Sequence, residues 1–206
     1  MRNNERIIWI DVAKGITIIL VIIGHTISGI GRGLIFSFHL PLFFILSLIT
    51  YKTSNNSEQL VKNVSKGFKH LIIPAYMMFM CSTLILLRNV NCRDISSIRD
   101  YFRNVILTAS FASGVEVPVN GTVIWCFGIP WFLVVLFIGR IIYDYFQMKY
   151  SPSKLMGLCI VFALMGWLIG NIQWLPFSID IAFFILPFLW IGDHFEKFNI
   201  EQKKMV

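Results

Sequence analysis

Long apolar runs separated by polar stretches dominate the chain. Those long enough to cross the ~30 Å hydrocarbon core of a bilayer span residues 15–30, 34–51, 71–87, 131–146, 155–170 and 177–191. The pattern predicts an all-α fold, a polytopic membrane helix bundle with about six transmembrane helices. Residues 101–113 form a further apolar run that is short, so we expect an interfacial or re-entrant segment there and not another crossing.

The composition excludes an ordinary soluble domain. Hydrophobic residues make up 56% of the chain, charged residues only 14%, and the mean hydropathy is +0.71. The first apolar run follows Arg2 and Arg6, as in a secretory signal. It is too long for a signal and contains Asp11 and Lys14, so we expect a retained first helix within a single membrane domain over residues 1–206.

The net charge of +7 has an explanation in the membrane orientation. With the N-terminus inside, the inner segments contain most of the 18 Lys and Arg residues. Positive charge on inner loops sets the orientation of membrane proteins. We therefore expect a multi-pass protein of the plasma or inner membrane with both termini in the cytoplasm, and no nucleic-acid partner.

The first span carries ionisable residues at a helical spacing. Lys14 and His25 are eleven positions apart in DVAKGITIILVIIGH. On a helix this spacing brings them to within about 20° of one face and ~16 Å apart, with Asp11 on the same stripe. A charge in the bilayer costs roughly 2.5–3.5 kcal/mol, so such residues normally face a bundle interior or a wet cavity. Alternatively, Asp11 and Lys14 form a juxtamembrane ion pair and His25 is a packing residue.

The second span carries a histidine close to a proline, in FSFHLPLFF. Pro41 either opens the second helix or kinks it and frees the carbonyl of Ser37. In both cases we expect His39 toward the outer face, near the level of His25. Two imidazoles at similar depth on neighbouring helices can form a catalytic site or a structural hydrogen-bonded pair.

The polar segments carry weaker signals. Residues 54–70 predict an interfacial amphipathic helix with Lys62, Lys66 and Lys69 on one face. Residues 89–129 form the most polar, external segment, where Trp125 and Trp131 fit an aromatic belt better than a sugar-binding site. Cys92 and Cys126 both fall in this segment, where an oxidising compartment would allow them to pair. The sequence has no metal-ligand spacing, nucleophile elbow, phosphate loop or internal repeat.

Four stretches, in this order, resemble the membrane acyltransferase-3 family and its fucose-O-acetylase-like branch: RIIWIDVAKGITIILVIIGH, FSFHLPLFFILS, KHLIIPAY and PWFLVVLFIGR. Members of this family are integral-membrane O-acyltransferases of cell-surface sugars. Their signature is a basic residue, ten others and then His, which Lys14 and His25 match. Many members have Arg where this chain has Lys14.

The resemblance implies a reaction and roles for the ionisable residues. Acetyl-CoA, or another acyl-CoA, would donate its acyl group from the cytoplasm to a hydroxyl of a cell-surface or lipid-linked saccharide, without a tightly bound cofactor or a metal. Lys14, oriented by Asp11, would bind the donor, and the catalytic residues would be His25, as general base, and His39. We expect direct transfer, with an acyl-histidine intermediate as the variant. The lysine face of residues 54–70 would attract the phosphates of coenzyme A or, as the alternative, anionic lipid headgroups.

Family members are usually longer and have more spans than this chain. We therefore expect a domain truncated at its C-terminus, which is either completed by a second chain or inactive. The competing interpretation is a partial membrane subunit or transport-type component without catalytic activity.

Overall fold

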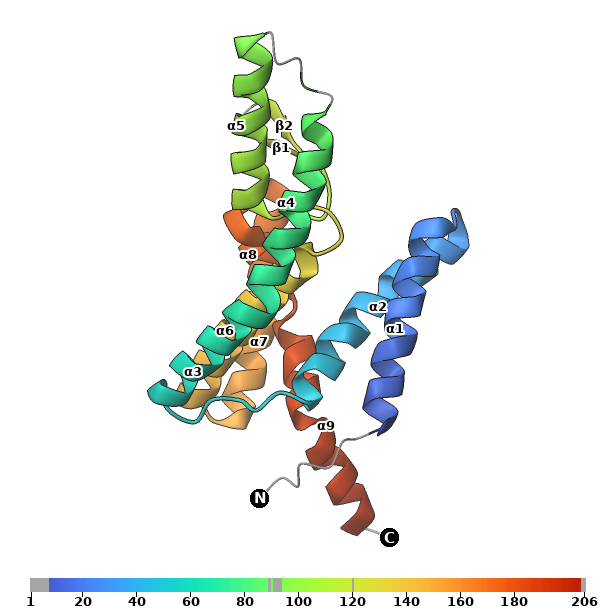
Figure 1. The fold of residues 1–206 in the computed structure, drawn as a ribbon. Helices are drawn as coiled ribbons and strands as arrows, with labels where there is room; N and C mark the ends of the chain where they lie inside the picture. The colour runs from blue at the N-terminus through green and yellow to red at the C-terminus, as the bar shows by residue number, and fades with distance from the viewer. Residues whose placement is uncertain (1–7, 89, 91–93, 120, 205–206) are drawn as a thin grey trace. The chain divides into compact units, whose positions relative to one another are not determined.

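The computed structural model describes residues 8–88, 90, 94–119 and 121–204. It divides into two compact units. The terminal unit comprises Met1–Thr53 and Pro187–Val206, and the central unit comprises Ser54–Leu186. Helices make up nearly all of the regular structure, and the described strands form one small hairpin (Figure 1). The prediction of an all-α helix bundle is confirmed.

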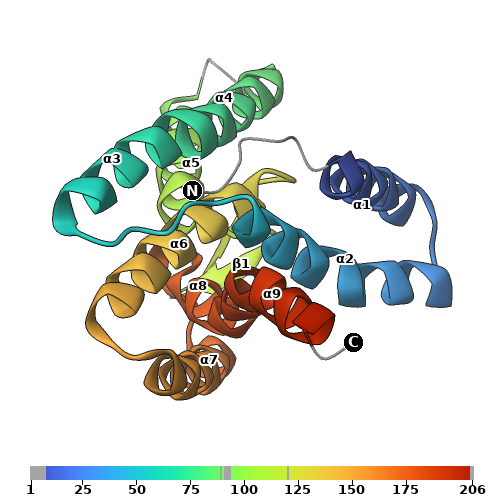
Figure 2. The same ribbon diagram turned by 90° about the horizontal axis from the view of Figure 1, so that it is seen from below.

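The terminal unit contains α1 (Ile8–Thr26), α2 (Ile30–Ile49) and, from its second residue on, α9 (Leu186–Lys204). The first two lie side by side and run in opposite directions (Figures 1 and 2). A short turn joins them, and Gly29 in this turn has a φ of 76°, which glycine adopts without the strain a Cβ would add. Gly29 therefore allows the chain to leave α1 and enter α2 within a few residues.

Helix α9 packs closely on α2. A Cβ added at Gly192 would collide with the carbonyl oxygen of Ile45 and the Cβ of Leu48, so only glycine allows this approach. The ring of Phe195 lies 6.0 Å from that of Trp9, at the start of α1. The start of α1, the end of α2 and α9 thus share one small apolar core, whose buried members are Ile10, Leu46 and Ile49.

Pro41 lies inside α2 and does not open it. The helix begins eleven residues earlier, at Ile30. The first of the two alternatives for this proline is therefore wrong, and because Pro41 has no backbone N–H it cannot donate to the carbonyl of Ser37, four residues before it. His39 is buried on the turn before the proline.

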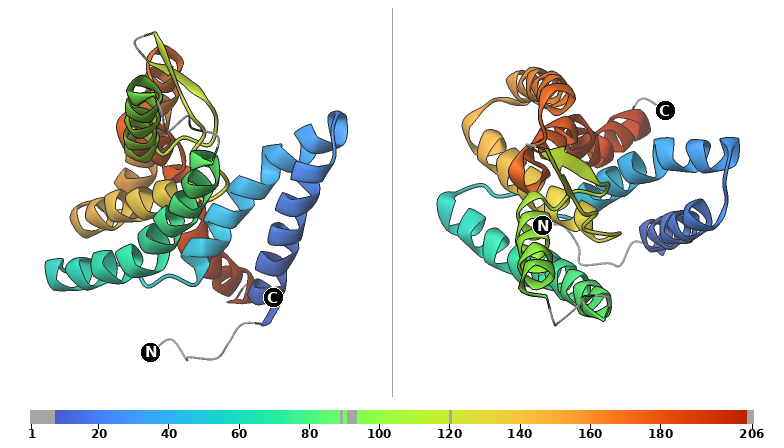
Figure 3. Two further views of the ribbon diagram at one scale, coloured as in Figure 1. Left: turned by 45° about the horizontal axis from the view of Figure 1, so that its top comes forward. Right: turned by 90° about the horizontal axis from the view of Figure 1, so that it is seen from above.

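In the central unit, the predicted amphipathic helix is continuous with the span that follows it. Here α3 (Ser57–Gly67) passes through a π-helical turn (Phe68–Ile72) into α4 (Ile73–Leu87), which makes one helical rod (Figures 2 and 3). Asn56 caps the start, because its side chain accepts a hydrogen bond from the backbone N–H of Gln59. The 31 residues from Ser57 to Leu87 would extend over about 46 Å, more than a hydrocarbon core, so α3 projects beyond the membrane-spanning part.

Helix α6 is the centre of the central unit and contacts α3, α4, α7 and α8. The remaining elements, in chain order, are α5 (Ile95–Phe111), β1 (Val117–Val119), β2 (Thr122–Ile124), α6 (Trp131–Lys149), α7 (Pro152–Ile172), a 3₁₀ turn (Pro176–Ser178) and α8 (Ile179–Phe184). The strands pair antiparallel, with Val117 opposite Ile124 (Figure 3). Helix α6 buries residues on several faces, as expected for a helix surrounded by others.

Hydrogen bonds among Ser54, Asn63 and Asp144 connect α3 to α6. The hydroxyl of the fully buried Ser54 donates to Asp144 Oδ2 over 2.5 Å, and Asn63 Nδ2 donates to Ser54 Oγ over 2.9 Å. Buried polar groups are stable only when they are hydrogen-bonded in this way. The apolar core of the unit lies elsewhere, where the rings of Phe79 and Phe127 stack 4.6 Å apart.

Five helical segments among the described residues are long and apolar enough to cross a membrane: Trp9–Thr26, Ile30–Ile49, Ser57–Leu87, Trp131–Lys149 and Pro152–Ile172. The first, second, fourth and fifth match the predicted spans within about six residues at each end, and the third ends where predicted but begins at Ser57 and not at residue 71. The sixth, predicted over residues 177–191, is not one continuous helix, because the helical backbone is interrupted at Ile185, between Pro176–Phe184 and Leu186–Phe195. Pro187, two residues after this interruption, has no backbone N–H to donate to the carbonyl of Phe183, so an uninterrupted helix would lack that hydrogen bond.

The other predicted segments are partly confirmed. The short apolar run forms α5, which starts earlier than expected at Ile95 and is not among the candidate spans found in the described residues. Trp125 and Trp131 pack within the protein: the first lies 5.9 Å from Tyr101, ring to ring, and the second fills the space beside Gly114. Cys92 lies outside the described residues, and Cys126 is a free cysteine whose Sγ lies 3.0 Å from the carbonyl oxygen of Gly114, so the structure does not contain the predicted disulfide.

Candidate active site

A single helix carries three of the four predicted site residues. Asp11, Lys14 and His25 all lie on α1, which is helical from Ile8 to Thr26. The segment that carries Asp11, Lys14 and His25 is therefore helical, as the predicted stripe requires. The rise of ~1.5 Å per residue separates Lys14 from His25 by ~16 Å along the helix axis. The fourth residue, His39, lies on the neighbouring helix α2.

Lys14 is turned toward the end of α2. Its Nζ donates a hydrogen bond to Thr50 Oγ1 over 2.8 Å, which links the first turns of α1 to the residue that ends α2. Asp11 lies in the first turn of α1, one turn before Lys14. A carboxylate at that position interacts favourably with the positive end of the helix dipole, in addition to the lysine charge nearby.

The two imidazoles lie on either side of one phenylalanine ring. The ring centroid of Phe36 is 5.3 Å from that of His25 and 5.2 Å from that of His39. Such tilted arrangements are favourable for aromatic pairs at these distances. The structure therefore brings His25 and His39 to a similar level on neighbouring helices, as the sequence predicted, with Phe36 as the shared contact.

The two histidines differ in their surroundings. His39 is 4% exposed, and its Nδ1 lies 2.7 Å from the carbonyl oxygen of Ile35. A carbonyl only accepts, so Nδ1 carries the proton of a neutral ring and Nε2 is left as the basic nitrogen. His25 is exposed within this chain, with one side of its ring against Phe36. One imidazole is thus held in a fixed tautomer, and the other is accessible.

The Lys14–His25 stripe follows the edge of the α1–α2 contact. The buried positions of α1 are Ile10, Thr17 and Gly24, at intervals of seven residues. At ~100° per residue, the line through Lys14 and His25 lies roughly 70° around the helix from this packed face. Both residues border α2 from that position, which is why Lys14 reaches Thr50 and His25 reaches Phe36.

Several residues of the site were not predicted from the sequence. Phe36 separates the imidazoles, Arg32 places its guanidinium carbon 5.1 Å from the centre of the same ring, and Thr50 accepts from Lys14. Gly24 permits this arrangement, because an added Cβ would lie 2.6 Å from Cε1 of Phe36. The available signal was Gly24 itself, a glycine inside an apolar helix directly before His25.

The site contains no group that resembles a metal centre. Within the described part of the chain, no three His, Cys, Asp or Glu side chains gather closely enough to hold a metal ion. Its ionisable groups are one ammonium, one guanidinium, one carboxylate and two imidazoles. Such groups bind anions and transfer protons.

Comparison with protein families gives one match for this chain. Residues 7–203 match the acyltransferase domain of the acyltransferase-3 family. The chain belongs to the acyltransferase-3 family. Separate comparisons with curated proteins and with solved structures gave no match. Membership of the acyltransferase-3 family, together with the apolar helices, identifies a multi-pass membrane protein of an acyltransferase family, and the resemblance found in the sequence is confirmed.

Proposed function

We propose that this acyltransferase-3 protein moves an acyl group, with acetyl as the default, from cytoplasmic acyl-CoA to a hydroxyl of a cell-surface or lipid-linked saccharide. The observation that carries the proposal is the arrangement on α1 and α2, where an ammonium lies ~16 Å along one helix from a pair of imidazoles. The donor is made in the cytoplasm and the acceptor lies beyond the membrane, so the protein needs a donor-binding group near one end of the span and a catalytic group near the other.

Lys14 supports donor binding in this proposal. An ammonium is a compact cation that pairs well with phosphate or polarises a carbonyl. Its contact with Thr50 holds the ammonium between the start of α1 and the end of α2, so its position is defined before a donor arrives. Asp11, one turn away, orients the lysine and balances its charge.

The imidazoles support the proton transfer. The acceptor hydroxyl attacks the thioester carbonyl, an imidazole takes the hydroxyl proton, and the carbon–sulfur bond breaks to release coenzyme A, whose thiolate sulfur regains a proton. A positioned general base contributes typically 10²–10⁴-fold to such a reaction. We assign the base to His25, which is accessible, and a positioning role to the buried His39 and the intervening Phe36. No serine or cysteine is needed in this scheme, which favours direct transfer.

The test uses His25→Ala and Lys14→Ala in cells that make the acetylated glycan. We expect glycan acetylation to fall by roughly 10²-fold or more for His25→Ala, because the general base is lost. Lys14→Ala should instead weaken the binding of labelled acetyl-CoA to the purified protein. His70→Ala and Lys154→Ala are matched controls, since both side chains are exposed and lie in the central unit.

Two outcomes contradict the proposal. Unchanged acetylation in the His25 and Lys14 variants, at normal protein levels, would remove these residues from the reaction. Absence of acetyl-CoA binding to the folded wild-type protein would favour the non-catalytic alternative, a partial subunit or transport-type component.

A further inference from the structure

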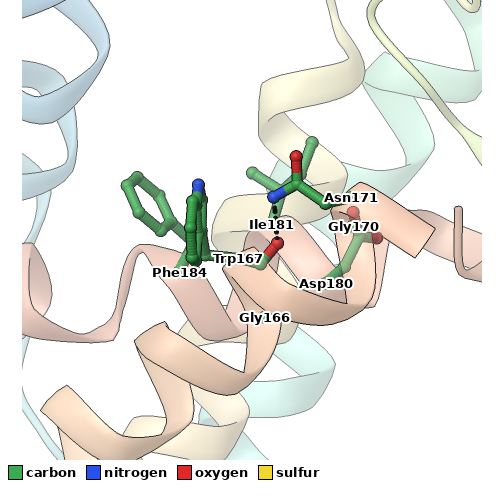
Figure 4. A pocket seen from close by; sticks show the side chains of 7 residues that line it. All are labelled: Gly166, Trp167, Gly170, Asn171, Asp180, Ile181 and Phe184. Atoms are coloured by element: carbon green, nitrogen blue, oxygen red, sulfur yellow. Dashed lines mark hydrogen bonds between the residues drawn. The ribbon is translucent and has the colours of Figure 1, made fainter. Parts of the chain in front are cut away.

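A cavity lies between α7 and α8, wholly within the central unit (Figure 4). It encloses about 250 Å³ and is open on one side. This is smaller than the roughly 300–1,000 Å³ of pockets for drug-sized ligands, so it suits a single small ring. The cavity contains none of the residues assigned above to acyl transfer.

The two sides of the cavity differ in chemistry. Trp167 and Phe184 lie next to each other on one side, and Asn171 and Asp180 lie toward the other (Figure 4). The tryptophan side chain is 57% exposed, so its indole face is available for contact. A ligand that fits here has an apolar face for the rings and polar groups on another edge.

Asp180 is the polar group that requires a partner. The residue is 3% exposed, and the backbone N–H groups of Leu175 and Ile181 interact with its carboxylate, while its buried Oδ1 has no hydrogen-bond partner among the residues that the structure describes. Buried oxygen atoms are rarely left unpaired in folded proteins. Gly170 faces the same carboxylate: a Cβ added there would lie 3.0 Å from Asp180 Oδ2, so the glycine keeps the space beside the carboxylate open.

Asn171 adds a second acceptor. Its Nδ2 donates to the carbonyl oxygen of Trp167 over 2.7 Å (Figure 4), which leaves the amide oxygen to accept. Two acceptors beside two aromatic faces match a molecule with several O–H donors and a flat C–H face, which describes a sugar ring. A metal ion would need more oxygen or nitrogen ligands than this single carboxylate and amide provide.

The place of the cavity in the chain suits a polar ligand. Asn171 lies in the last turn of α7, next to its final residue Ile172, where a spanning helix meets water. The turn before α8 is joined to the residue that ends α5, because Ser178 Oγ donates to the carbonyl oxygen of Ala112 over 3.1 Å, and α5 is not among the candidate membrane spans of the described residues. With the N-terminus in the cytoplasm, this end of the fifth span is the external one.

We propose that this cavity binds a sugar ring of the acceptor saccharide, with Asp180 accepting from a ring hydroxyl and Trp167 stacking on the C–H face. The inference rests on the proposed function only for the nature of the acceptor. It assigns to the central unit a binding role that is separate from the proton transfer and donor binding of the terminal unit.

The test measures sugar binding directly, without acyl-CoA. The full chain in nanodiscs is titrated with methyl glycosides of glucose, galactose, mannose, rhamnose and fucose, and binding is followed by saturation-transfer NMR. We expect at least one glycoside to bind, with the strongest transfer at ring C–H protons. Asp180→Asn should weaken its binding by about tenfold or more, since a hydrogen bond to a charged group is lost, and Trp167→Leu should abolish the C–H transfer.

Matched variants separate this role from a structural one. Leu168→Ala alters an exposed neighbour on α7 that does not line the cavity, and Asp100→Asn removes an acidic residue of α5; both should bind sugar like the wild type. Thermal unfolding identifies variants that fail to fold, and Asn171→Ala then provides a milder second probe of the same cavity.

The outcomes also distinguish this inference from the proposed function. If the wild-type chain binds a glycoside but transfers no acyl group, and Asp180→Asn loses that binding, the sugar-binding role of the cavity is supported and the proposed acyl-transfer function is refuted. Acyl transfer in Asp180→Asn with an unchanged KM for the acceptor refutes the cavity and leaves the function intact. The saccharide assignment would also be overturned if none of the glycosides binds. It would be overturned as well if tetramethylammonium, a cation that a carboxylate and aromatic rings also attract, binds the cavity with the same affinity as the glycoside and displaces it.

Discussion

The two units of this acyltransferase-3 protein differ in how much of their surface is packed. In the terminal unit, α1 exposes most of its isoleucines, and only Ile10, Thr17 and Gly24 are buried on the part of the helix with described side chains. In the central unit, α6 is surrounded by other helices and Phe127 is almost fully buried. The exposed apolar side chains of α1 suit contact with lipid tails. The residues proposed for acyl transfer therefore belong to the terminal unit, which is sparsely packed, whereas most of the internal packing is in the central unit.

The largest expected effect is on the stability of the central unit. Phe127→Ala removes a ring that stacks on Phe79 and also contacts Tyr76, and it leaves a cavity. We expect a loss of about 3–5 kcal/mol in the free energy of unfolding, measured by denaturant titration in detergent. Phe177→Ala, at an exposed ring of the same unit, is the control. A loss below about 1 kcal/mol, as at surface sites, would show that the stacked rings do not stabilise this unit.

The same residue type should behave differently in the terminal unit. Phe36→Leu removes the ring between His25 and His39 and should lower the acyl-transfer rate by up to about 10²-fold, because small displacements of catalytic groups have effects of this size. Stability should change little, since Phe36 is only partly buried. Phe38→Leu, at an exposed position two residues away, should leave both unchanged. Equal rates for the two variants would exclude a positioning role for Phe36.

Glycine contacts allow a matched comparison of the two units. An added Cβ would collide with a backbone carbonyl oxygen both at Gly192, against Ile45, and at Gly166, against Asp180. Each Gly→Ala change should cost about 1–3 kcal/mol through overpacking. Gly157→Ala has open space around it and should be neutral or slightly stabilising in the helix. Thermal unfolding of the three variants is the measurement, and a neutral Gly192→Ala would show that α9 does not pack tightly on α2.

The sequence predicted the helices of both units better than the contacts between them. Periodicity and length placed α1, α2, α6 and α7 within several residues, and they placed Lys14 and His25 on one helix. These are properties of a single segment, which the hydrophobic pattern specifies.

Contacts between helices depend on crossing angle and axial position, which no single segment specifies. Phe36 between the imidazoles, Thr50 beside Lys14 and the close approach at Gly192 are contacts of this kind. The break in the sixth predicted span was also missed, because Pro187 lies within an otherwise continuous apolar run. The join of α3 to α4 was missed because a polar stretch next to an apolar one predicts two elements.

The smallest expected effect is local and depends on pH. Asp94 caps α5: its side chain accepts from the backbone N–H of Ser96 and from the hydroxyls of Ser96 and Ser97. These hydrogen bonds lower the pKa of Asp94 from 3.8 to about 2. A carboxyl whose pKa is lower in the folded state stabilises that state above its unfolded pKa, and the contribution is lost as the pH falls.

Hydrogen exchange in the first turn of α5 should therefore accelerate between about pH 4 and pH 2, after correction for the intrinsic pH dependence of exchange. Asp94→Asn keeps a side chain that can cap the helix but cannot titrate, so its exchange should be independent of pH in this window. Asp100→Asn, farther along the same helix, should retain the wild-type profile. If Asp94→Asn shows the same acceleration as the wild type, another group titrates there, and the stability of this helix would depend on packing against α4 and β2.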